Sequence, residues 1–93
     1  MINAIVLIQA AADSIPETAQ AIADIDGVSE VYSCAGDVDL IALVRVATHD
    51  DLAELIPAKI SKVSGVIDTD THIAFRSYST ADTESAFSLG ATE

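Results

Sequence analysis

An internal repeat constrains the fold of this chain more than any other feature of its sequence. The apolar segment at 2–8 recurs at 40–46, and the tripeptide DGV at 26–28 recurs as SGV at 64–66. Both recurrences have the same offset of 38 residues. Short apolar runs rich in β-branched residues predict strands, and the stretches between them carry apolar residues at helical spacing. Each half of the chain therefore predicts a strand, a helix, a glycine and a second strand.

Two such units in series predict a βαββαβ chain, the ferredoxin-like arrangement of the α+β class. Right-handed crossovers then place both helices on one face of a four-stranded antiparallel sheet. Ser14 with Glu17, and Thr48 with Asp51, have capping-box spacing, and Pro57 is expected to kink the second helix. Gly27 has the position of a C-terminal helix cap. The predicted strands are 2–10, 28–35, 39–46 and 66–79, and the predicted helices are 14–27 and 48–65.

The first and third strands carry apolar residues on both of their faces. In this topology they are the two central strands, and the helices cover only one side of them. The simplest cover for the other side is the same face of a second copy, related by a two-fold axis. We therefore expect a homodimer with sheets packed face to face, a dimeric α/β barrel.

The length and charge of the chain limit its organisation and its partners. Its 93 residues predict one domain at 1–79 and a polar tail at 80–93, which could form a short helix that docks on a neighbour. The chain carries 15 Asp and Glu against 4 Lys and Arg, for a formal net charge of -11. Nucleic acids and anionic membranes are bound through clustered cations, so we expect contact with neither.

Cysteine content and the N-terminal segment bear on location. The single cysteine, Cys34, allows no intrachain disulfide, which is typical of proteins in a reducing cytoplasm. The N-terminal apolar run is short and lacks a basic segment before it, which argues against a signal peptide and a membrane span. We expect a cytoplasmic protein.

Two polar motifs are candidates for a binding site. Gly-Asp-Val-Asp at 36–39 opens an apolar strand, and Asp-Thr-Asp-Thr at 68–71 lies in the last strand. The ordinary explanations are a polar hairpin turn and the β-propensity of threonine. The functional explanation pairs Asp37 or Asp39 with a ligand ammonium and aims the hydroxyls of Thr69 and Thr71 at a carboxylate.

Other reactive side chains form no recognisable constellation in the sequence. His49 falls in the first turn of the second helix and is expected to be solvated. His72 lies on the charged face of the last strand, where we expect it to be buried or at an interface. No spacing of His, Cys or carboxylates indicates a metal site, and Cys34 has no basic neighbour that would mark a nucleophile. No catalytic residue and no cofactor are predicted.

The run VSEVYSCAGDVDLIALVRV, followed by GVIDTDTHIAF, resembles the effector-binding domain of the Lrp/AsnC regulators, which is also called the RAM domain. The resemblance is carried by a Gly-Asp-x-Asp turn and by Gly-Val-x-x-Thr-x-Thr at the start of the last strand, and it covers nearly the whole chain. It implies a two-fold dimer, often assembled into octamers or decamers, with amino acid effectors in clefts between dimers. Carried over by position, the ligand-binding candidates are Tyr32, Gly36, Asp37, Asp39, Thr69 and Thr71.

The chain also departs from the pattern of that family. Its regulators usually carry a helix-turn-helix domain before this one, whereas the first strand here begins at Met1, so we expect a stand-alone RAM protein. Val38 and Leu40 stand where relatives carry more aromatic residues, which leaves the selectivity for the effector side chain open.

The resemblance implies a non-enzymatic module that binds a small effector, oligomerises and modulates transcription indirectly, by co-assembly with a full-length regulator. Two alternatives remain. One is a small dimeric ferredoxin-like enzyme of the monooxygenase type, in which His72 would be the acid–base residue. The other is a purely structural oligomerisation module with a vestigial cleft. Turnover or haem uptake would indicate the first alternative, and absence of ligand-linked stabilisation the second.

Overall fold

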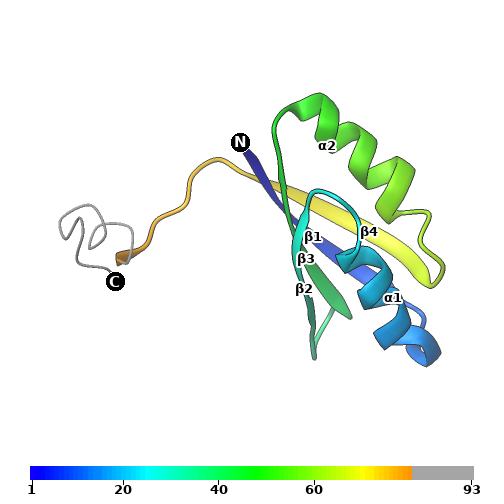
Figure 1. Ribbon diagram of the computed structural model, residues 1–93. Coiled ribbons are helices and arrows are strands. Elements are labelled where there is room, and N and C mark those ends of the chain that lie inside the picture. Colours follow the sequence, from blue (N-terminus) through cyan, green and yellow to red (C-terminus); the bar gives the residue numbers. More distant parts are fainter. Residues whose placement is uncertain (81–93) are drawn as a thin grey trace.

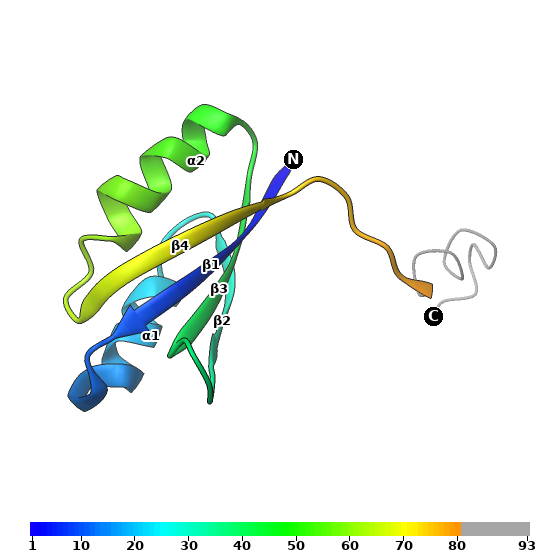
Figure 2. The same cartoon turned by 180° about the vertical axis from the view of Figure 1, so that it is seen from behind.

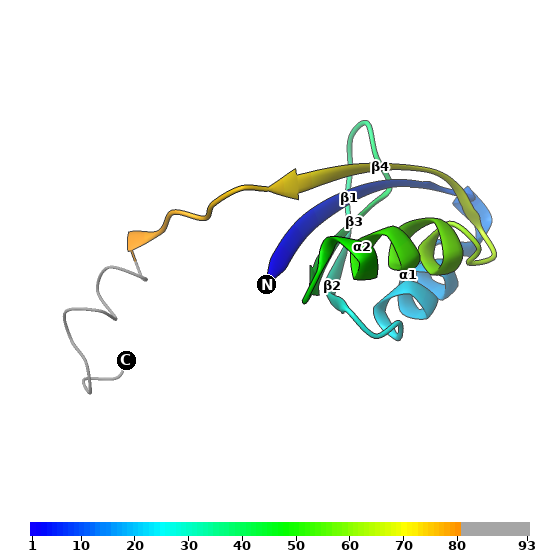
Figure 3. The same cartoon turned by 90° about the horizontal axis from the view of Figure 1, so that it is seen from above.

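A computed structural model describes residues 1–80, which form a four-stranded antiparallel sheet with the helices on one face (Figures 1 and 3). The strand order β2-β3-β1-β4 is that of the predicted ferredoxin-like fold. η1 is a 3-10 turn and η2 is a π-helical continuation of α2. The elements are β1 (Ile2–Ala10), η1 (Ala12–Ser14), α1 (Ile15–Ala23), β2 (Val28–Ser33), β3 (Leu40–Val46), α2 (His49–Leu55), η2 (Ile56–Ile60) and β4 (Val66–Ala74).

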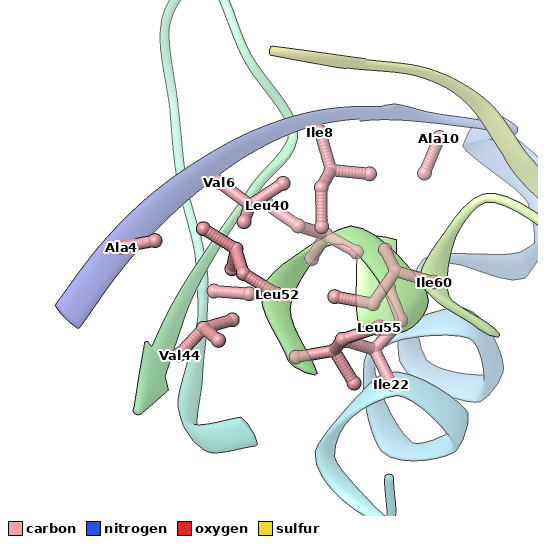
Figure 4. Close-up of a cluster of buried hydrophobic side chains, with 11 residues drawn as sticks. Ala4, Val6, Ile8, Ala10, Ile22, Leu40, Val44, Leu52, Leu55 and Ile60 are labelled. Atoms are coloured by element: carbon pink, nitrogen blue, oxygen red, sulfur yellow. The ribbon is translucent and has the colours of Figure 1, made fainter. Parts of the chain in front are cut away.

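The first strands of the two sequence repeats, β1 and β3, pair with each other at the centre of the sheet. Their ladder runs without interruption from Ile2 opposite Val46 to Ile8 opposite Leu40. Because strand side chains alternate between faces, the even-numbered residues of both strands point to the helices. This face forms one core with both helices (Figure 4). The buried core residues are Ala4, Val6, Ile8, Ala10, Ile22, Leu40, Ala42, Val44, Leu52, Leu55 and Ile60.

The second capping box is confirmed and the first is wrong. The Thr48 hydroxyl accepts the backbone N–H of Asp51 at 3.1 Å, and the Asp51 carboxylate accepts that of Thr48 at 3.2 Å. Ser14 makes no side-chain cap, because its hydroxyl lies 3.3 Å from that of Thr18 instead. The 3-10 turn η1 precedes α1 and orients Ser14 in this way. Gly27 lies in the turn beyond the end of α1 rather than at its cap.

Four predicted elements were too long. The first helix, predicted over 14–27, ends at Ala23. The second helix stops at Ile60, where the predicted irregularity around Pro57 takes the form of a π turn closed by the Ser61 N–H on the Ile56 carbonyl at 2.9 Å. β2 stops at Ser33. β4 stops at Ala74 because it pairs there with Asn3, at the start of β1, and beyond that point it has no neighbouring strand. The predicted tail helix lies outside the described residues.

A buried hydroxyl ties α1 to the loop that leads into β4. Thr18, 1% exposed, donates to the carbonyl of Ser64 at 3.1 Å. The next residue, Gly65, has φ +98°, in the region that favours glycine. A Cβ atom at Gly65 would overlap the Thr18 hydroxyl. The second glycine of the repeat is therefore required by both its backbone conformation and its close packing.

We predict that Gly65→Ala lowers the free energy of unfolding by about 2–4 kcal/mol, because left-handed strain and a steric overlap add. Gly36→Ala is the matched control. Gly36 also has a positive φ, +126°, but nothing lies within 4 Å of its Cβ position. Urea unfolding measures both variants. Equal losses at the two positions would show that the contact with Thr18 contributes nothing.

Candidate functional site

The face of the sheet that the helices leave uncovered has an apolar centre, and it is turned to the viewer in Figure 2. Ile5 and Leu7 of β1 lie directly opposite Leu43 and Ile41 of β3. None of the four is buried, and Ile5 is 40% exposed. Contiguous apolar side chains on an open sheet are typical of an interaction surface.

Charged and aromatic side chains flank this centre on the two edge strands. On β2 the Tyr32 hydroxyl donates to the Glu30 carboxylate at 2.6 Å, and this hydrogen bond, with the negative charge of Glu30, raises the pKa of Tyr32. On β4, Nε2 of His72 lies 3.3 Å from Oδ2 of Asp70. The expectation that His72 is buried is wrong for the single chain, because its side chain is 59% exposed. Its place at an interface stays a prediction.

Asp39 completes the hydrogen bonding of β1 at the point where the central ladder stops. Oδ2 of Asp39 accepts the backbone N–H of Ala10 at 2.8 Å, and the Asp39 N–H donates to the Ile8 carbonyl at 3.0 Å. The carbonyl of Asp39 accepts the N–H of Cys34 at 2.9 Å and so closes the turn. The Ala10 N–H lies beyond the end of the β1–β3 ladder and is partly buried. A buried N–H without an acceptor would lower the free energy of unfolding. The Asp39 carboxylate therefore stabilises the fold by accepting this N–H.

Asp37 contributes its backbone rather than its side chain to the fold. Its carbonyl accepts from Nε2 of Gln9 at 2.6 Å, which anchors the tip of the turn to β1. Its carboxylate is exposed and has no partner within residues 1–80. Gly36, with φ +126°, allows the chain to reverse just before it. The turn thus holds a free carboxylate on a fixed backbone.

The two threonines lie on the other side of the sheet. Thr69 is opposite Ile8 and Thr71 is opposite Val6, so both point to the helix side of the edge strand β4 and are half-buried. Tyr32 is on the uncovered side of β2, and two strands separate β2 from β4, a distance of about 14 Å. The single chain therefore does not gather the six predicted residues into one pocket.

Gln9 is the contact that sequence reasoning missed. A glutamine on the outward face of an otherwise apolar strand was the available signal, but its partner, 28 positions away, depends on the pairing of β1 with β3. His49 is exposed at the start of α2, as expected. Within residues 1–80, no three His, Cys, Asp or Glu side chains cluster in a way that could hold a metal ion. None of the helices in that range has the length and apolar character that a bilayer crossing requires.

We predict that Asp39→Ala lowers the free energy of unfolding by about 1–3 kcal/mol, because the Ala10 N–H loses its acceptor. Asp39→Asn keeps an acceptor oxygen and should lose less. Asp37→Ala, the matched control in the same turn, should stay within about 0.5 kcal/mol of the parent. Hydrogen exchange of the Ala10 amide tests the cause directly. Unchanged protection of that amide in Asp39→Ala would contradict the assignment.

Comparison with known proteins places the fold in context. The family model described as the Lrp/AsnC ligand binding domain matches residues 3–83. The crystal structure of TTHA0845 from Thermus thermophilus superimposes with a TM-score of 0.79 at 39% identity, over 85% of this chain and 99% of that chain.

More distant matches include full regulators. The uncharacterized HTH-type transcriptional regulator PF0250 of Pyrococcus furiosus is 36% identical over 59 residues, which are 63% of this chain. The match spans 39% of that regulator's length. The regulator NMB0573 of Neisseria meningitidis, solved as an L-Met complex, has a TM-score of 0.74 at 13% identity, over 85% of this chain and 54% of its own.

Proposed function

Because the chain belongs to the family of Lrp/AsnC ligand-binding domains, we propose that it is a non-enzymatic module that binds an amino acid and oligomerises. The observation that carries the proposal is the family match across residues 3–83. Similarity to HTH-type regulators supports a role in transcription. A net charge of -11 disfavours contact with nucleic acid, so we propose an indirect, cytoplasmic role through co-assembly with a full-length regulator.

The ligand class follows from the chemistry of the turn. An amino acid carries an ammonium and a carboxylate. The free carboxylate of Asp37 suits the ammonium, whereas one oxygen of Asp39 is already engaged with Ala10. Backbone N–H groups around Gly36, together with a threonine hydroxyl, suit the carboxylate. The L-Met complex of the Neisseria protein supports an amino acid as the ligand class.

We propose that more than one chain contributes to the site. Thr69 and Thr71 lie on the edge strand farthest from β2 and on the opposite face from Tyr32. Thr69 is opposite Ile8, whose carbonyl accepts the Asp39 N–H, so one strand separates it from the turn of its own chain, whereas Tyr32 is on the far edge strand. We propose that the effector binds in a cleft between chains, with the turn from one and β4 from the other.

The first contact between chains is the uncovered sheet face. Ile5, Leu7, Ile41 and Leu43 of each copy would be removed from water, and burial of one such side chain contributes about 1.5–3 kcal/mol. We propose a two-fold homodimer built on this face, and dimers that associate further into octamers or decamers around the effector clefts.

We predict that Ile5→Lys weakens the dimer at least about tenfold, because a charge replaces apolar area at the centre of the contact. Ile67→Lys is the matched control, since Ile67 is 69% exposed and lies at the bulge near the start of β4, outside the apolar centre. Sedimentation equilibrium measures both. A monomeric parent protein, or equal dissociation constants for the two variants, would count against a dimer on this face.

We predict that one or more of the twenty amino acids stabilises the protein. A ligand at about ten times its Kd adds about 1.4 kcal/mol, or roughly 5–10 °C in Tm for a domain of this size. Asp37→Asn should weaken that ligand about tenfold by removing the charge that faces the ammonium. Asp50→Asn, the same change at the start of α2, should leave the affinity unchanged.

The same screen, with mass measured by light scattering, separates the alternatives. A hit that changes the oligomer supports an effector sensor. A stable oligomer without any hit would favour a purely structural module and overturn the amino acid proposal. Turnover or haem uptake by the purified protein would favour the enzyme alternative, with the exposed pair His72 and Asp70 as its candidates.

A further inference from the structure

The segment that follows β4 is an aromatic arm with no place in the proposed effector site. Residues 75–80 leave the sheet where β4 loses its neighbour, and both views show them directed away from the helices (Figures 1 and 3). Phe75 is 97% exposed and Tyr78 is 84% exposed. Aromatic side chains this exposed can supply apolar contact area to a partner.

An acidic pocket lies on the helix side, at the end of the sheet where β3 stops. It has a volume of about 250 Å³. It lies just below the range of about 300–1,000 Å³ that is usual for drug-sized ligands, and it is large enough for a side chain. Apolar side chains and three carboxylates line it together with one ammonium: Val46, Leu55, Asp26, Asp51, Glu54 and Lys59.

The arm and the pocket complement each other in charge. Arg76 is one of only 4 Lys and Arg in the chain. Within residues 1–80, Arg76, Asp26 and Glu54 have no side-chain partner, whereas Asp51 is engaged in the cap of α2. Phe75 is at the bend where the arm leaves β4, whereas Arg76 and Tyr78 follow it within the arm, two positions apart. One arm can therefore present a cation and an aromatic ring at once.

We propose that the arm of one chain docks in the acidic pocket of a second copy, with Arg76 on Glu54 and Asp26 and Tyr78 against the apolar floor. The arm continues the direction of β4 away from its own body, and residues 75–80 include neither glycine nor proline to reverse it. Docking in a second chain needs no reversal. This contact is separate from the sheet-face dimer and would link dimers into larger assemblies.

The test uses charge reversal in the full chain carrying Ile5→Lys, which weakens the sheet contact. Arg76→Glu alone and Glu54→Arg alone should each lower the association constant at least about fivefold, as expected for the loss of an ion pair. An equimolar mixture of the two variants should associate again, because each chain then meets a partner of opposite charge. Sedimentation velocity measures all three samples.

Matched controls separate this contact from net charge. Lys62→Glu and Glu17→Arg make the same charge changes at exposed positions elsewhere and should associate like the parent. Tyr78→Ser should weaken association, and Phe75→Ser should not. If mixing restores nothing, or if the reversals behave like their controls, docking between chains is wrong. Either result leaves the effector proposal intact, since that is read from the Tm shift with amino acids.

Discussion

The antiparallel pairing of β1 with β3 is the contact on which the rest of the structure depends. It joins the two repeats at equivalent positions, so one set of side chains from each strand enters the helix-covered core. The same register leaves the other set, Ile5, Leu7, Ile41 and Leu43, on the uncovered face. A sheet whose central strands are apolar on both sides cannot be satisfied by one layer of helices. The uncovered apolar face, on which we propose that a second chain packs, therefore follows from the same register that builds the core.

The end of that ladder explains why two carboxylates precede a buried strand. The pairing of β1 with β3 stops at Ile8 and Leu40. Beyond it, the Asp39 carboxylate accepts the Ala10 N–H, and this hydrogen bond holds the turn against β1. Gln9 fixes the tip of the turn through the Asp37 carbonyl. The Asp37 carboxylate can then stay free without loss of order in its backbone, which is the arrangement that the proposed ammonium site requires.

The periodicity of the sequence was sufficient for the topology, because the repeat, the central strands and the uncovered face all follow from alternation and burial. Details set by contacts distant in the chain were not predictable. Ser14 has the spacing of a cap but its hydroxyl turns to Thr18, and β4 stops where β1 begins. Within the candidate site, the Gly-Asp-x-Asp turn could be predicted from the sequence. The placement of Thr69 on the opposite face from Tyr32 required the registers of three strand pairs.

Electrostatics limits how such chains can meet. A net charge of -11 makes copies repel, although salt screens this beyond about 8 Å. Association therefore needs apolar area at its centre and the few cations at its contacts. Arg45 lies on the uncovered face, opposite Asn3, and Arg76 lies on the arm. Lys59 lines the pocket, so three of the four cations lie at the two proposed contacts, and acidic surface elsewhere disfavours other arrangements. Charge then determines mainly which contacts form, whereas the burial of apolar area determines how strongly the chains associate.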